Sequence, residues 1–219
     1  MLGRKRELRL GSPATYRRRT IVRRRLAVAG VVLAAGVGVF LFTRSEEPPE
    51  PEEVRGSPAW ALEHYGDPDA KRYKKRNIVQ IEFLGRAMFV HESAARHFLR
   101  LARLFEARAP EYAAIVDDGE LDDWSYENRG VRGQVSSKSN HAFGLAVDVN
   151  ALTNVLGTTG DMPAEVVAQW EVEGGDWGGD WSRPDPMHFE THLTPQEIAE
   201  RYNPDGTPKD WYLEELIGE

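Results

Sequence analysis

The sequence predicts a domain of the α+β class that follows one membrane-spanning helix and a linker. Three observations predict this organisation: an uncharged apolar stretch near the N-terminus, an alternating stretch typical of a β-hairpin, and an amphipathic helix directly after it. We divide the 219 residues into a basic tail (1–25), an apolar anchor (26–43), a linker (44–56) and one domain (57–219).

The apolar stretch at 26–43 runs for eighteen residues without a charge. This is at the short end for a membrane-spanning helix, which usually needs about 20 apolar residues. Arginines precede the stretch and glutamates follow it, so we expect the N-terminus in the cytoplasm and the domain outside it. A long signal peptide, of the twin-arginine type, is the alternative. No convincing small-x-small cleavage site follows Phe42, which favours a retained anchor.

The net charge of -7 conceals an asymmetry along the chain. Residues 1–44 carry 11 lysines and arginines against one acid, and the remaining residues carry 17 against 34 acids. An acidic domain argues against nucleic acid as its main partner. The chain has no cysteine, which excludes disulfides and thiolate metal ligands. The absence of cysteine does not identify the cellular compartment, because a core of this size can be stable without disulfide bonds.

The first elements of the domain follow from turn residues and alternation. The linker is rich in proline and glutamate, so we expect it to be extended and solvated. Ser57 and Pro58 then begin a short helix that Gly66 ends. Apolar and polar residues alternate over 77–84, and the chain returns over 87–91, which predicts a hairpin.

Helical spacing of apolar residues predicts an amphipathic helix over 92–107. We assign His91 and His97, which flank or enter this helix, to the scaffold. The helix predicted near the C-terminus begins with a capping box and a proline at its first position. The later elements are predicted as a polar loop region at 117–138, a strand at 145–151, a helix at 163–170, a flexible aromatic loop at 174–181, a strand at 187–191, and helices at 194–202 and 211–217.

Two stretches about forty residues apart supply the candidate chemistry: His141 and Asp148 in the first, Asp185 and His188 in the second. Two imidazoles and two carboxylates suit a hard or borderline divalent ion, and three protein ligands plus a water make a catalytic zinc site. Strand alternation puts Asp148 opposite its apolar neighbours, where a carboxylate is costly to bury without a cation or hydrogen bonds. Gly144 would let the backbone fold tightly enough to bring His141 towards it.

Asp185 lies three residues before His188, near enough to reach a metal-bound water without occupying the metal. We therefore expect it to act as the general base. The alternative is that His141, Asp148 and His188 are ordinary polar residues of loops and strand ends. The spacing of the sequence offers no partner residue for His192, so we leave this histidine out of the site.

The motifs around these residues resemble those of the M15 peptidases, the zinc D-alanyl-D-alanine carboxypeptidases of the VanY type and the related L-alanyl-D-glutamate endopeptidases of phage endolysins. The resemblance covers about residues 77–190. Its most specific blocks are Ser139-x-His141-x-x-Gly144-x-Ala146-x-Asp148, Trp177-Gly178-Gly179-Asp180-Trp181 and Asp185-Pro186-Met187-His188-Phe189-Glu190.

The resemblance implies a small antiparallel sheet that carries the ligands, with helices packed against it. It implies Zn²⁺ held by His141, Asp148 and His188, with Asp185 as the catalytic acid and base. It also implies a substrate-orienting arginine upstream, for which residues 126–133 are the similar region.

We favour Arg129 over Arg132 for that arginine. A guanidinium there fits as a clamp on a peptide carbonyl or carboxylate, or as an electrophile for an oxyanion. Ser139 could bind substrate or only shape its loop. Trp177 and Trp181 could line the rim of the cleft or pin a surface loop.

The expected function is zinc-dependent hydrolysis of an amide bond in the peptidoglycan stem peptide, with D-alanyl-D-alanine carboxypeptidase favoured. An outward-facing domain on a membrane tether suits that substrate. An L-alanyl-D-glutamate-type endopeptidase and a non-catalytic, zinc-containing wall-binding module are the alternatives, and Asp185 argues against the second. A pure membrane scaffold would not need these residues. The sequence leaves open which bond is cut and the oligomeric state.

Overall fold

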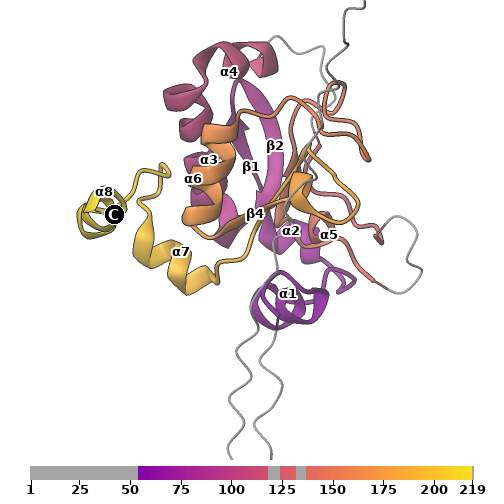
Figure 1. The fold of residues 1–219 in the computed structure, drawn as a ribbon. Coiled ribbons are helices and arrows are strands. Elements are labelled where there is room, and N and C mark those ends of the chain that lie inside the picture. The colour runs from indigo at the N-terminus through magenta and orange to yellow at the C-terminus, as the bar shows by residue number, and fades with distance from the viewer. Residues whose placement is uncertain (1–53, 118–123, 132–136, 219) are drawn as a thin grey trace, which may run out of the picture. The chain divides into compact units, whose positions relative to one another are not determined.

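The computed structural model describes residues 54–117, 124–131 and 137–218. The predicted tail, the apolar anchor and all but the last three residues of the linker lie outside this part. Within it, no helix has the length and apolarity needed to cross a membrane. The described part has the α+β architecture that the sequence predicts, with two small antiparallel sheets and helices beside them (Figure 1).

The first sheet is the predicted hairpin. Strand β1 (Ile78–Phe83) pairs antiparallel with β2 (Arg86–His91), so that Ile81 lies opposite Met88. The turn between them has positive φ at both central residues, Leu84 and Gly85, as a two-residue hairpin turn requires. Ile81 is buried while its neighbours along β1, Gln80 and Glu82, are exposed, which confirms the alternation.

The amphipathic helix predicted after the hairpin is confirmed. A 3₁₀ turn over Glu92–Ala94 leads into α3 (Ala95–Arg108), which buries an apolar face against the hairpin. His97 is fully buried on this helix, and its Nδ1 lies 2.8 Å from the Thr191 hydroxyl. Burial keeps the pKa of His97 well below its usual range, so it is a neutral core residue.

The second sheet carries the motifs that the sequence singled out. Its strands are β3 (Ala146–Asp148), β4 (Gly175–Trp177) and β5 (His188–Thr191), in the antiparallel order β3-β5-β4. The register places Asp148 directly opposite His188. Alternation along β5 sends Phe189 into the core, 5.9 Å from the Phe105 ring, and leaves His188 and Glu190 on the other face.

The prediction of a flexible loop at 174–181 is wrong. This segment forms β4 and then a 3₁₀ turn over Gly178–Asp180. Its glycines serve close packing, because a Cβ on Gly175 would overlap the Trp170 indole, and one on Gly179 would overlap Trp177. A glycine required by a close approach looks, in the sequence, like a glycine that confers flexibility.

The remaining helices surround the two sheets. Helices α3 and α6 pack against each other (Figure 1). A buried ion pair between Arg100 and Glu173, with Nη2 and Oε1 2.6 Å apart, ties α3 to the end of α6, and the Tyr202 hydroxyl donates to Glu173 at 2.9 Å. These helices are α1 (Pro58–Tyr65), α2 (Tyr73–Asn77), α4 (Pro110–Asp117), α5 (Asn140–Phe143), α6 (Ala164–Val172), α7 (Pro195–Arg201) and α8 (Asp210–Gly218).

Two predicted helix starts are confirmed in detail. The Ser57 hydroxyl accepts from the backbone N–H of Trp60, and α1 ends at Gly66. Thr194 and Glu197 form the predicted capping box at the start of α7. The strand predicted at 145–151 is shorter than expected, since β3 covers only its centre, and α5 just before it was not predicted.

Candidate metal centre

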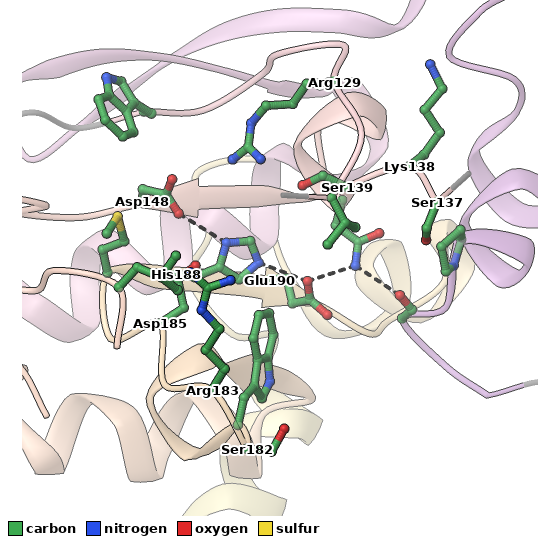
Figure 2. Close-up of a pocket in the computed structure, with 18 residues that line it drawn as sticks. Arg129, Ser137, Lys138, Ser139, Asp148, Ser182, Arg183, Asp185, His188 and Glu190 are labelled. Atoms are coloured by element: carbon green, nitrogen blue, oxygen red, sulfur yellow. Dashed lines mark hydrogen bonds and ion pairs between the residues drawn. The ribbon is translucent and has the colours of Figure 1, made fainter. Parts of the chain in front are cut away.

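Three side chains from separate elements converge at one point. The Nε2 atom of His141, the Nδ1 atom of His188 and the Oδ1 atom of Asp148 are 3.1, 3.1 and 3.2 Å from one another. All three side chains are buried. The structure therefore brings together the three residues that the sequence predicts as metal ligands. Figure 2 shows two of them, Asp148 and His188.

The spacing of these donors fits zinc. Four-coordinate zinc with bonds of about 2.0 Å to nitrogen and oxygen has its ligand atoms about 3.3 Å apart. The three distances observed here lie just below that value. Two imidazoles and one carboxylate also leave a fourth position open, as catalytic zinc sites do.

His141 is held with its Nε2 lone pair towards the centre. Its Nδ1 atom lies 2.7 Å from the Ser125 carbonyl oxygen, and a carbonyl can only accept, so Nδ1 carries the proton. The short helix α5 presents this ring: Ser139 caps the helix, and Gly144 ends it with φ of 74°. A Cβ at Gly144 would lie 2.5 Å from the His91 backbone nitrogen, so this turn requires glycine.

His188 is held in the same way through a carboxylate. Its Nε2–H donates to Oε2 of Glu190 at 2.9 Å, which leaves the Nδ1 lone pair for a metal. A ligating histidine whose second nitrogen donates to a carboxylate or carbonyl is the usual arrangement in metal sites, because this bond fixes the tautomer and the ring orientation. Both histidines therefore have the outer partner that a metal ligand needs.

The charges at the centre favour an ionised Asp148. Burial alone would raise its pKa, but the neighbouring charges and hydrogen bonds of His141 and His188 outweigh burial and hold the pKa far below its usual range. Without a metal, Asp148 and Glu190 likewise raise the pKa of His188 to about 10 against the opposing effect of burial. The pocket is thus built to stabilise positive charge beside Asp148.

Glu190 is a site residue that sequence reasoning missed. Its buried carboxylate accepts hydrogen bonds from His188, from Asn140 Nδ2 at 2.8 Å and from His192 Nε2 at 2.7 Å. The signal was present, because residues two apart on a strand share a face, which places Glu190 beside His188. The prediction that His192 lacks a partner is wrong: Glu190 is its partner.

A second group of possible ligand atoms, from Asp176, Glu190 and His192, lies next to the first. Its members are already engaged with protein groups. Glu190 and His192 bond to each other, and Asp176 accepts the indole N–H of Trp181 at 2.7 Å. The first group is therefore the candidate metal site.

Asp185 lines the same cleft as Asp148 and His188. A tight turn sets its place: the His188 backbone N–H donates to the Asp185 carbonyl at 3.0 Å, and the Asp185 N–H donates to the Gly178 carbonyl at 2.7 Å. Glycine is needed at 178, because a Cβ there would lie 2.5 Å from the Asp185 carbonyl oxygen. The turn places Asp185 and His188 on the wall of one cleft.

That cleft has a volume of about 480 Å³, within the range of small-ligand sites. Arg129 and Ser139 both line it, whereas Arg132 lies outside the described residues. The Ser139 hydroxyl accepts from the His141 backbone N–H at 3.4 Å, so it shapes the loop while facing the cleft. Arg129 Nε pairs with Glu127 at 3.1 Å, and its side chain points towards Asp148 and His188 (Figure 2).

Of the two tryptophans considered for the rim of the cleft, only Trp181 lines it. Trp181 lines the cleft, with its ring centroid 5.0 Å from that of His188. Trp177 is not a lining residue, and its indole N–H donates to the Pro186 carbonyl at 2.8 Å. The cleft also contains a cation that sequence reasoning missed, Arg183, whose side chain extends towards His188 from the side opposite Arg129 (Figure 2).

Two buried imidazoles and a carboxylate beside an open cleft, with a further carboxylate on its wall, form the donor set of a mononuclear metal hydrolase. Residues 132–191 match the family model described as D-alanyl-D-alanine carboxypeptidase, of the M15 peptidases. The match confirms the resemblance to the M15 peptidases, and the matched segment carries all three candidate ligands and Asp185. No curated protein matches the chain, and no solved structure does.

Proposed function

We propose that this chain is a zinc-dependent peptidase that hydrolyses an amide bond of the peptidoglycan stem peptide, as a D-alanyl-D-alanine carboxypeptidase. One observation carries the proposal: His141, Asp148 and His188 converge to within 3.2 Å beside Asp185, inside the segment that matches the carboxypeptidase family. The three converging residues would hold the zinc.

A zinc ion bound there would supply a Lewis acid and would lower the pKa of a coordinated water towards ~7. The protein's own contribution to proton transfer comes from Asp185. Its carboxylate takes the proton of the attacking water and returns it to the nitrogen of the leaving amine. Trp181 limits the access of bulk water on one side of the cleft, since it covers the His188 ring.

Cationic side chains in the cleft favour a substrate with a free carboxylate. Arg129, Lys138 and Arg183 all line it. Lys138 and Arg129 already pair with Asp69 and Glu127, whereas Arg183 has no ion-pair partner within the described part of the chain. A guanidinium binds a carboxylate through two parallel hydrogen bonds, which suits the terminal carboxylate of a carboxypeptidase substrate.

The same donors could serve an endopeptidase of the L-alanyl-D-glutamate type, whose cleft must accept chain on both sides of the bond. A binding module without catalysis is the remaining alternative, and the presence of Asp185 argues against it. The apolar stretch at 26–43 would hold the domain on the outer side of a membrane, close to the wall. This location is part of the proposal.

Mass spectrometry of the products tests the proposal. The zinc-loaded full chain is incubated with a muropeptide that carries a defined pentapeptide stem. Loss of the terminal D-alanine alone identifies a D,D-carboxypeptidase, and release of the peptide beyond L-alanine identifies the endopeptidase. A folded, zinc-loaded chain that forms neither product overturns the proposed function.

A further inference from the structure

The three residues before α1 lie against the metal centre. We call Arg55–Ser57 the strap. The Arg55 guanidinium makes two hydrogen bonds of 2.9 Å to the Glu197 carboxylate and a third of 3.1 Å to the His192 carbonyl. Arg55 and Gly56 fall at the end of the predicted linker, which we expected to be solvated, yet Gly56 is a lining residue of the cleft.

One end of Glu190 is connected to the strap through Asn140. The Asn140 Nδ2 group donates to the Gly56 carbonyl at 2.9 Å and to Oε2 of Glu190 at 2.8 Å. Both partners can only accept, so the orientation of the amide is settled, and both of its N–H bonds are used. The same carboxylate oxygen receives the Nε2–H of His188. A continuous hydrogen-bonded chain therefore runs from the strap to a candidate metal ligand (Figure 2).

The other end of Glu190 is connected through His192. Its Nε2 atom lies 2.7 Å from Oε1 of Glu190. The Cα of Gly56 packs directly on this imidazole, because a Cβ there would overlap three atoms of the ring. The Arg55 guanidinium donates to the carbonyl of His192 and so holds the backbone of His192 in place. The strap thus fixes the positions of both outer partners of the Glu190 carboxylate.

We propose that the strap is a positioning element of the metal centre, acting through Asn140 and His192 on Glu190 and through Glu190 on His188. The proposal rests on the zinc site of the proposed function. A buried carboxylate that loses a hydrogen-bond partner shifts towards another donor, since its desolvation is otherwise uncompensated. The His188 ring then loses the bond that orients it.

The simpler explanation is that the strap only begins α1, where Ser57 is the cap. The two roles differ in what they affect. A cap stabilises the fold and leaves the affinity of a site elsewhere unchanged. A positioning element sets the metal affinity of a chain that is still folded.

Two glycines that flank α1 separate these roles. Gly56 and Gly66 have similar positive φ angles of 76° and 84°, so alanine is strained at both. Only at position 56 does the added Cβ meet His192, whereas at position 66 its nearest neighbour is Tyr73 at 3.8 Å. Gly66→Ala is therefore a matched control for Gly56→Ala.

The measurement is zinc affinity by chelator competition on the full chain, together with the thermal midpoint of the metal-free protein. We expect Gly56→Ala to weaken zinc binding by roughly tenfold or more. Gly66→Ala should lower the midpoint through its φ alone and leave the zinc affinity within about twofold. Equal zinc affinities in the two variants overturn the proposal.

A second pair of variants covers the case in which Gly56→Ala does not fold. Asn140→Ala removes the amide between the strap and Glu190. Asn128→Ala removes an amide that bonds to Asp69, Pro68 and Lys138 and touches neither the strap nor Glu190. Only Asn140→Ala should weaken zinc binding, and wild-type affinity in this variant overturns the proposal. Because zinc affinity is the readout, an inactive chain that binds zinc normally contradicts the proposed function alone. A wild-type chain that binds no zinc overturns both.

Discussion

The Nε2 atom of His188 lies 2.9 Å from the carboxylate of Glu190, two residues further along the same strand. Strand geometry puts both side chains on one face of β5, so the residue that orients the imidazole is built into the same element as the imidazole. The orientation of this candidate ligand therefore depends on a carboxylate outside the group of three converging donors, and on the residues that hold that carboxylate.

Glu190→Gln should weaken zinc binding by about 10–100-fold, the range found when an outer partner of a metal ligand is lost. Glutamine replaces one of the two Glu190 carboxylate oxygens with an NH₂ group. That group would face another hydrogen-bond donor, either His192 or both His188 and Asn140. Chelator competition measures the effect. Glu200→Gln is the control, since Glu200 bonds only to Gln196 among the described residues. Equal affinity in both variants would contradict the role of Glu190.

Asp185→Asn should lower kcat/KM for the muropeptide by at least about 100-fold, while zinc content stays at the wild-type level. The amide has the shape of the carboxylate but cannot take up the proton of the attacking water. Steady-state kinetics with metal analysis of the same sample measures both quantities. A variant that cleaves at the wild-type rate would show that Asp185 is not the base.

Gly144→Ala should destabilise the fold by about 2 kcal/mol or more, because it combines a strained positive φ with a close contact. The added Cβ would lie 2.5 Å from the His91 backbone nitrogen. Gly157→Ala is the control. Gly157 has a φ of 88°, and a Cβ added there would have nothing within 4 Å, so this variant measures the cost of the φ angle alone. Denaturant unfolding of both variants measures the difference. Equal free energies of unfolding would contradict the packing argument.

Arg183→Gln should raise KM roughly tenfold for a stem peptide with a free terminal carboxylate, from the loss of a charge-assisted hydrogen bond. A substrate with a terminal carboxamide should be bound equally by the variant and the wild type. Arg103→Gln is the control, since Arg103 pairs with Asp205 and does not line the cleft. An unchanged KM for the free carboxylate would exclude Arg183 as its partner.

The bond between Arg55 and Glu197 predicts a pH dependence of stability. Burial raises the pKa of Glu197, but hydrogen bonds from Arg55 and Thr194 outweigh burial and lower it from 4.5 to about 2. A carboxyl group with a lowered folded-state pKa stabilises the fold above its unfolded pKa and loses this effect as the pH falls. The thermal midpoints of wild type and Glu197→Gln should therefore differ at pH 6 and converge between pH 4.5 and pH 2. A gap that stays constant with pH would contradict this assignment.

The sequence identifies the three side chains that converge, but not the residues that support them. His141, Asp148 and His188 stand in short motifs, and their chemistry points to one ion, so their convergence could be expected before any fold was known. The hairpin and α3 could be predicted because they follow local periodicity. The segment at 174–181 was misjudged because a glycine packed against Trp170 has no local signal.

The support of the centre comes from pairings that no local pattern reveals. Asn140 reaches Gly56 across 84 positions, and the contact depends on where the whole domain places α1. The Ser125 carbonyl accepts from His141, although the sequence predicts residues 117–138 only as a polar loop. Arg183 looks like a solvated loop charge in the sequence, and only the turn between Trp181 and Asp185 brings it to the cleft.

Zinc dependence is tested most directly by titrating zinc into the metal-depleted full chain and measuring the rate of D-alanine release from a pentapeptide muropeptide. We expect negligible release without metal, and a rate that rises with zinc and levels off at one equivalent per chain. A metal-depleted chain that releases D-alanine as fast as the zinc-loaded chain would show that the activity does not depend on zinc.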